Sequence, residues 1–245
     1  MTLKELNIIN FKNIAEATLT FTSGFNCFVG NNGVGKTNVL DAIYHLSMCK
    51  SYFNLPDLQN IRHEEPFFVV QGKYERGGEE LTVYCGVKRG QKKVFKKNQK
   101  AYDKLSEHIG LIPLVMISPE DFILIDGGSE ERRKLVDGII SQCDRVYLHR
   151  LIRYNKALTQ RNMLLKSAAG KFLDPEMLEV WNEQLAEHGE AIRQKRIAFL
   201  KEFRSVFQTY YERLSLGREE VCLEYKPSVK EGNFLTALKQ AADRD

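Results

Sequence analysis

Apolar and polar residues alternate at the start of the chain in the pattern of half-buried strands. Leu6 and Ile8 alternate with polar neighbours, and Leu19 and Phe21 alternate with threonines. A period of two places successive side chains on opposite faces of a sheet. The pattern predicts two strands joined by a turn around residues 10–15.

Two short runs are mainly apolar and predict buried strands. Residues 25–29 form the first run, and residues 114–117 form the second. Between them, residues 67–74, 81–87 and 92–97 predict three further strands, with Gly77 and Gly78 forming a turn. The first half of the chain is therefore predicted to be rich in strands.

Helical periodicity first appears directly after the first apolar run. Val39, Leu40, Ile43 and Leu46 recur at spacings of one helical face. From residue 119 onward the pattern is helical, with one helix running to about residue 168 and a break at Gly170.

The second long helix is predicted at residues 176–215. Before it, Asp174 is predicted to be the N-cap, followed by a proline at the first helical position. Its heptad-like seam runs from Leu178 to Leu214 and weakens at Lys195; if the helix is continuous, its length is about 60 Å. Two helices joined by a short loop predict an antiparallel hairpin. Residues 219–226 then predict a strand.

Composition places the chain among ordinary globular proteins. It has 245 residues, 43% of them hydrophobic and 28% charged, with a formal net charge of +4. No apolar stretch has the length of a membrane span, so we expect a cytoplasmic protein with no membrane partner. The five cysteines lack a paired spacing, which argues against a disulfide framework or a zinc site.

The strongest chemical signal is a glycine-rich motif between the apolar run at 25–29 and the helix that follows. It fits the phosphate-binding pattern G-x-x-x-x-G-K-[ST] at every fixed position. Glycines turn backbone N–H groups onto a phosphate, the lysine reaches the β- and γ-phosphates, and the threonine hydroxyl ligates Mg²⁺. We therefore predict an ATP and magnesium site, with Thr37 as the metal ligand and no catalytic residue assigned. Its residues, the phosphate loop, are Gly30, Asn31, Asn32, Gly33, Val34, Gly35, Lys36 and Thr37.

Basic residues cluster around the turn that follows the strand at 81–87. No acidic residue occurs from Leu81 to Tyr102. Such a hairpin is equally compatible with contact to a nucleic-acid backbone and with a solvated sheet edge. A second basic set lies at 145–156. The first cluster contains Lys88, Arg89, Lys92, Lys93, Lys96, Lys97 and Lys100, and the second contains Arg145, Arg150, Arg153 and Lys156.

Several blocks resemble the RecF family and its SMC-type ATPase relatives. Residues 6–13 (LNIINFKN) resemble the family's start, and residues 35–44 resemble its continuation of the phosphate loop. Further similarity lies in Cys49-Lys50-Ser51, Ile61-Arg62-His63 and Ser118-Pro119-Glu120-Asp121. The stretch from Gly127 through Arg132-Arg133 to Asp137 and the blocks at 154–158 and 160–166 are similar to RecF itself.

The resemblance implies an ABC-type, SMC-head-like ATPase that acts in recombinational repair, replication-gap processing and the SOS response. It implies binding to single- and double-stranded DNA at gaps and junctions, an ATP-dependent homodimer, and joint action with RecO and RecR in loading RecA. The expected fold is α/β: a P-loop NTPase mixed sheet lobe at 1–118, a helical-hairpin lobe at 119–217, and a strand and helix at 218–245 that return toward the ATPase lobe.

Two departures from the family's pattern affect local contacts, and two absent motifs bear on activity. Phe53 stands where family members often carry an arginine, and Gly128-Ser129-Glu130 lacks the family's proline. No signature Ser-x-Gly-Gln segment occurs, and the apolar run ending at Asp126 resembles a Walker B strand only superficially. We therefore expect a chain truncated before these motifs that binds nucleotide without hydrolysing it, so whether it acts as an enzyme stays open. The alternatives are a transporter nucleotide-binding domain and a non-catalytic interaction fragment.

Overall fold

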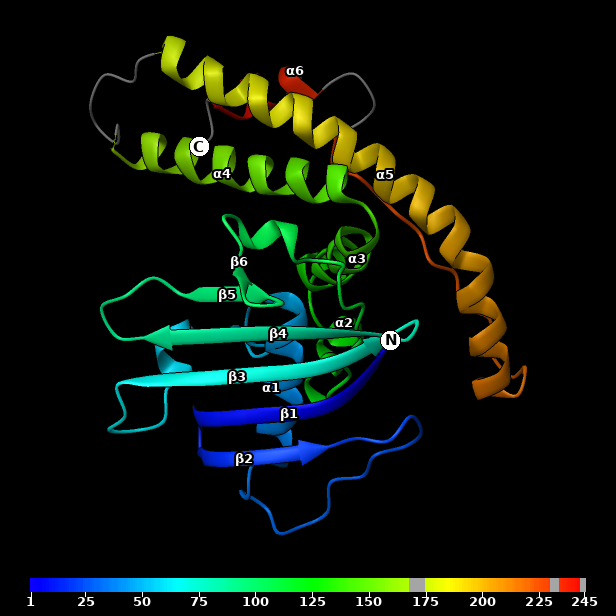
Figure 1. The fold of residues 1–245 in the computed structure, drawn as a ribbon. Coiled ribbons are helices and arrows are strands. Elements are labelled where there is room, and N and C mark those ends of the chain that lie inside the picture. The colour runs from blue at the N-terminus through cyan, green and yellow to red at the C-terminus, as the bar shows by residue number, and fades with distance from the viewer. Residues whose placement is uncertain (168–174, 230–233, 243–245) are drawn as a thin grey trace. The chain divides into compact units, whose positions relative to one another are not determined.

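The computed structural model describes residues 1–167, 175–229 and 234–242, which form two compact units (Figure 1). The first unit is Met1–Asp121 and the second is Phe122–Asp245. The division predicted from sequence, with boundaries at 118 and 217, stays a prediction.

The first unit is built on one sheet of six antiparallel strands in the order β2-β1-β3-β4-β5-β6 (Figure 1). Each strand pairs antiparallel with its neighbours, so the ladder has no parallel step among the described residues. One short 3-10 helix, Asp57–Asn60, lies between α1 and β3, and two more, Leu105–Glu107 and Pro119–Phe122, come after β6. The strands are β1 (Thr2–Phe11), β2 (Ile14–Thr20), β3 (Phe67–Arg76), β4 (Glu79–Lys88), β5 (Val94–Lys97) and β6 (Lys100–Ala101).

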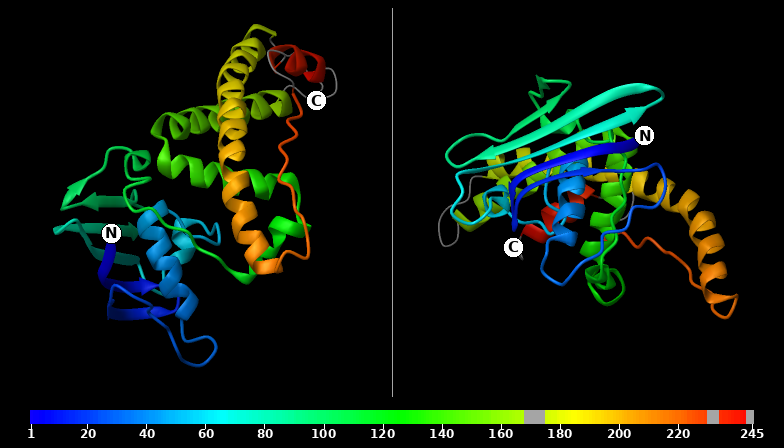
Figure 2. Two further views of the ribbon diagram at one scale, coloured as in Figure 1. Left: turned by 90° about the vertical axis from the view of Figure 1, so that its right-hand side faces the viewer. Right: turned by 60° about the horizontal axis from the view of Figure 1, so that its bottom comes forward.

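Helix α1 (Lys36–Met48) covers one face of this sheet (Figure 2). Alternation along the strands sends one set of side chains toward α1, among them the fully buried Leu6, Ile8 and Phe68. At Gly72 of β3 an added Cβ would come within 2.9 Å of Leu46 Cδ1, so a glycine permits the close approach of helix and sheet. This core fixes the position of α1 and hence of the loop that precedes it.

The second unit is helical. Helix α4 (Arg145–Ser167) and helix α5 (Pro175–Ser215) form the predicted antiparallel hairpin, because Arg161 of α4 meets Asn182 near the start of α5 while Asp144 at the other end meets Lys195. Helix α5 is one uninterrupted helix, so the continuity that the sequence left open is present. No helix in the described ranges combines the length and apolar character needed to cross a membrane. The remaining helices are α2 (Ile123–Asp126), α3 (Ser129–Cys143) and α6 (Phe234–Ala242).

Two predicted strands are wrong. Residues 25–29 and 114–117 are not strands, and Phe25, Val29, Val115 and Ile117 are exposed. An apolar run becomes a strand only beside another strand that can pair its backbone groups. Neither run joins a strand ladder in the described residues, and the local turn at 22–26 is held by the Asn26 side chain instead.

The predicted strand at 219–226 is also wrong. The segment is extended but unpaired, and α5 binds it through Arg204 Nε, which donates to Leu223 O at 2.6 Å, and through the Tyr211 hydroxyl, which donates to Glu219. The predicted helix break at Gly170 and the N-cap at Asp174 lie outside the described residues.

Candidate phosphate-binding site

The phosphate loop spans residues 30–37 and ends in the first turn of α1, which begins at Lys36 as predicted. Gly33 and Gly35 have φ values of 84° and 106°, a left-handed conformation that favours glycine. The first N–H groups of a helix have no partner within the helix. The loop therefore meets α1 at the end that attracts anions.

Lys36 folds back over its own loop. Its ammonium Nζ donates to the carbonyls of Gly30 and Asn31, each at 2.8 Å. These bonds hold the positive charge at the loop. Thr37 is exposed beside it on the first turn of α1. The geometry places an ammonium, a hydroxyl and helix-start amides together, which is the donor set of a triphosphate site.

A hollow of about 550 Å³ lies between β2 and the phosphate loop. Its volume falls in the range of small-molecule sites. The loop contributes Val34, Gly35 and Lys36, β2 contributes apolar side chains and Glu16, and residues 27–29 complete the lining with Val39. The hollow is therefore continuous with the loop that would bind phosphate.

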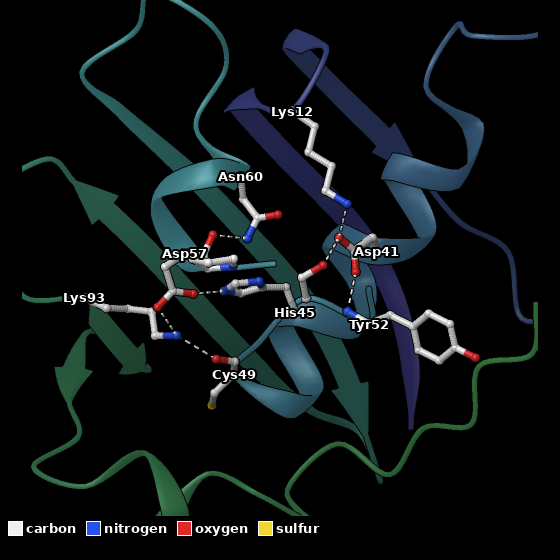
Figure 3. Close-up of polar contacts among 10 residues, drawn as sticks. Lys12, Asp41, His45, Cys49, Tyr52, Asp57, Asn60 and Lys93 are labelled. Carbon is white, nitrogen blue, oxygen red and sulfur yellow. Dashed lines mark hydrogen bonds and ion pairs between the residues drawn. The ribbon is translucent and has the colours of Figure 1, made fainter. Parts of the chain in front are cut away.

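A buried carboxylate fixes α1 against the turn between β1 and β2 (Figure 3). Asp41 of α1 is fully buried, and its carboxylate accepts from Lys12 Nζ at 2.6 Å. It also accepts from Ser51 Oγ at 2.8 Å and from the backbone N–H of Tyr52 at 2.7 Å. The Tyr52 hydroxyl in turn donates to Asp121. Asp41 thus joins the β1–β2 turn, α1 and the segment after α1.

One helical turn after Asp41, His45 is buried near the carboxylate of Asp57 (Figure 3). Its Nε2 lies 3.9 Å from Asp57, which pairs with Lys93 at 2.7 Å. Burial lowers the pKa of His45 to about 4, because a charged imidazole is costly away from water. Burial raises the pKa of the Cys49 thiol to about 12. Both groups are neutral at pH 7 and belong to the packing of the site.

Sequence reasoning missed Lys12, Asn13 and Asp41 as parts of the site. Asn13 contacts the loop directly, and Asp41 holds the turn in place through Lys12. The one available signal was a polar pair, Asp41 and His45, spaced four residues apart next to the apolar stripe of α1. Only the fold reveals that this pair faces inward.

The structure changes the predicted basic hairpin in two places. Lys93 is largely buried, because its Nζ pairs with Asp57 and also donates to Cys49 O at 2.7 Å. Lys96 lies over the Tyr84 ring, 5.4 Å from its centroid. The expectation that the whole cluster is free for a ligand is therefore wrong for Lys93. The exposed members are Lys88, Arg89, Lys92, Lys97 and Lys100.

Other predicted positions lie in the helical unit. The run before Asp126 is a short helix, so the interpretation that it is not a Walker B strand is confirmed. Arg132 donates to the carbonyls of Leu124 and Gly127, rather than to a carboxylate. Across residues 1–167, 175–229 and 234–242, no group of three His, Cys, Asp or Glu side chains could hold a metal ion. The second basic set on α4 is exposed: Arg145, Arg150, Arg153 and Lys156.

A glycine-rich phosphate loop leading into α1, packed on an antiparallel sheet, defines a P-loop NTPase. The model of the AAA ATPase domain family matches residues 1–229. The DNA replication and repair protein RecF of Phocaeicola vulgatus is 52% identical over all of this chain and 66% of its own length. RecF of Flavobacterium johnsoniae is 49% identical over all of this chain and 68% of its own.

Solved structures agree. A structure of the recombination mediator protein RecF with ATP in the RecFOR pathway matches with a TM-score of 0.86 and 31% identity, covering 99% of this chain and 66% of that one. The chain belongs to the RecF family. It spans about two thirds of the length of the curated relatives that it matches.

Proposed function

We propose that the chain is the ATP-binding part of a DNA repair and replication protein, with MgATP bound at the phosphate loop. The proposal rests on the phosphate loop, where the Lys36 ammonium lies beside the N–H groups at the start of α1. A RecF structure named for its ATP supports the same ligand. The hollow beside β2 has room for the nucleoside.

The decisive variant is Lys36→Ala. The Lys36 ammonium donates to carbonyls of its own loop and not to core groups, so its removal leaves the core intact. We expect MgATP affinity to fall by at least tenfold, because a charge-assisted hydrogen bond is worth about 1.5–3 kcal/mol. Isothermal titration measures it, with Lys73→Ala as control because Lys73 pairs with Glu5 on the sheet. Parent-like ATP binding by a folded Lys36→Ala protein contradicts the proposal.

Magnesium is proposed to bind at Thr37. Its exposed hydroxyl lies on the first turn of α1, next to Lys36. Thr37→Val keeps the shape of the side chain and removes the oxygen, so it is expected to abolish the gain in ATP affinity that Mg²⁺ gives. Because the run before Asp126 is helical, we further propose that this chain binds ATP without turning it over.

We propose that the protein binds gapped or junction DNA, both single- and double-stranded. We further propose that it forms an ATP-dependent homodimer and acts with RecO and RecR in loading RecA, in the cytoplasm and during the SOS response. The relatives are named for DNA replication and repair and one solved relative for the RecFOR pathway, which supports the role in DNA repair. Within the chain, the exposed lysines and Arg89 around β4–β6 suit a phosphate backbone.

The DNA proposal is tested by changing Lys88, Lys92, Lys97 and Lys100 together to glutamine. Every phosphate that the variant no longer neutralises should flatten the log–log salt dependence of duplex binding by roughly 0.9. Lys93 is kept, because its pair with Asp57 contributes to folding. The control changes four lysines that pair with carboxylates and so shifts net charge equally: Lys4, Lys73, Lys134 and Lys226. An unchanged salt slope in the test variant would transfer the proposal to the basic set on α4.

A further inference from the structure

The side chain of Asn13 bridges two parts of the phosphate loop. Its Nδ2 donates to Gly33 O at 2.7 Å, and its Oδ1 accepts from Asn38 Nδ2 at 2.7 Å. Gly33 lies in the middle of the loop, and Asn38 lies on the first turn of α1. One amide therefore spans the loop from its middle to the start of the helix.

The loop also packs directly on this side chain. An added Cβ at Gly35 would come 2.8 Å from Asn13 Oδ1 and 3.3 Å from Ile14 Cγ1. Gly35 thus has two reasons to be glycine, its positive φ and its contact with Asn13. The contact leaves no space for the loop to settle closer.

Asn13 itself is presented by a rigid turn. β1 and β2 pair through Phe11 and Ile14, so Lys12 and Asn13 form a two-residue connection. The backbone N–H of Lys12 donates to Asn60 O at 2.8 Å, and its side chain pairs with the buried Asp41. A side chain held by its neighbours in this way can impose a shape on a loop.

The bond to Gly33 also sets the direction of a backbone donor. In a trans peptide unit the C=O and the next N–H point in opposite directions. Holding the Gly33 carbonyl toward Asn13 turns the Val34 N–H away from it, and so fixes that donor before any ligand arrives. A loop that is ordered in advance loses less entropy when it binds.

We propose that Asn13 is a positioning residue that holds the phosphate loop in its phosphate-binding shape. This inference rests on the proposed nucleotide site. It assigns Asn13 no contact with the reacting atoms. It predicts that losing the amide weakens every ligand that binds through the loop, including ATP, ADP and inorganic pyrophosphate.

The test compares Asn13→Ala, Asn13→Asp and Asn7→Ala by titration with MgATP, MgADP and pyrophosphate. Asn13→Ala should weaken ATP and ADP alike by about tenfold, as for one hydrogen bond that orders a site. Asn13→Asp still accepts from Asn38 but cannot donate to Gly33, so it should bind at least as weakly. Asn7 is the matched control, because its amide bonds to Glu5 and Thr18 on the sheet and does not contact the loop.

The outcomes separate the two proposals. A parent protein that binds none of the three ligands overturns the nucleotide site itself. If the parent binds and a folded Asn13→Ala protein binds equally well, the nucleotide site stands and the positioning role is overturned. If Asn13→Ala lowers the melting temperature by several degrees, Asn13→Asp decides: it keeps the bond from Asn38 and loses only the bond to Gly33, and parent-like affinity there overturns the role.

Discussion

The two units of the chain reach order by different means. The sheet unit has a continuous apolar core that includes Phe11, Phe68 and Phe95, each almost fully buried. The helical unit has a smaller cluster around Ile140, Tyr147 and Ile192 among its described residues, and its other buried apolar residues are Leu148, Ala157, Leu178 and Leu185. A sheet covered by a helix buries one whole face, whereas helices in a hairpin bury one stripe each. The sheet unit is therefore the better support for a site whose geometry must be exact to a fraction of an ångström.

In the helical unit, polar contacts between helices add to the smaller apolar core. Arg196 of α5 binds both oxygens of Asp137 on α3, at 2.8 and 2.7 Å, and Lys195 binds Asp144 at 2.7 Å. Arg161 reaches Asn182 across the hairpin. Both units thus contain a shielded ion pair, Lys12–Asp41 in one and Arg196–Asp137 in the other. The first holds the phosphate loop's support, and the second ties helices together.

The largest effect is expected from breaking the pair in the sheet unit. Lys12→Met leaves the carboxylate of Asp41, which is 0% exposed, without its cation. An unpaired buried charge costs about 3–5 kcal/mol. Both carboxylates keep hydroxyl or N–H donors, but Arg196→Met should cost less, about 1–3 kcal/mol, because Asp137 is 14% exposed and water can reach its carboxylate. Urea unfolding of the two variants gives both free energies.

A double variant shows whether charge is the cause. Adding Asp41→Asn to Lys12→Met removes the stranded charge and leaves an amide of similar shape. Part of the lost stability should return in the double variant. Equal losses for Lys12→Met and Arg196→Met, or no recovery in the double variant, would contradict the contrast between the two units.

Acid should weaken the sheet unit through its buried histidines. Burial lowers the pKa of His45 to about 4 and also lowers the pKa of His108. The unfolded chain binds a proton at each below about pH 6.5, and the folded chain resists it. Stability is therefore complete above about pH 6.5 and is lost as pH falls toward 4, by about 3 kcal/mol for His45.

Urea unfolding between about pH 7.5 and 4.5, a window that spans the ordinary histidine pKa, measures this loss, with His45→Phe as the comparison. The imidazole packs edge-on against Phe11 and Phe68, so a phenyl ring has suitable neighbours. The charged groups that face His45 are Asp57, Asp41, Lys93 and Lys12. These charged groups are all present in His45→Phe, so the change in pH dependence between the two proteins reports the His45 share, which should vanish. A variant with the parent's full pH slope would contradict the assignment to His45.

Sequence patterns were sufficient to predict the elements whose apolar residues recur with the period of a strand or a helix. The alternation in β1, β3 and β4 and the stripes of α1, α4 and α5 gave these elements within a few residues. The phosphate loop and the start of α1 at Lys36 followed from a motif whose spacing is fixed by chemistry.

The sequence does not show which other segment each segment pairs with or packs against. Residues 25–29 and 114–117 have the composition of buried strands, but composition does not supply a neighbouring strand. Likewise, Lys93 reads as one more lysine of a basic turn, and only the fold brings Asp57 and Cys49 O within its reach. Asn13 joins the site through contacts 20 and 25 residues away in sequence.

The smallest effects are expected from one glycine in each unit, and they test the difference in packing directly. At Gly72 an added Cβ would come 2.7 Å from Tyr74 and 2.9 Å from Leu46, both buried in the core. Gly72→Ala should therefore cost about 1–3 kcal/mol, because neither neighbour has space to move.

At Gly189 of α5 the same methyl would meet the Phe234 ring at 2.6 Å, at the start of the short helix α6. Alanine gains about 1 kcal/mol over glycine inside a helix, which offsets the displacement of one ring. Gly189→Ala should thus be nearly neutral in urea unfolding while α6 gains faster hydrogen exchange. If Gly189→Ala costs as much as Gly72→Ala, the helical unit is packed as tightly as the sheet unit, and the contrast between their cores is wrong.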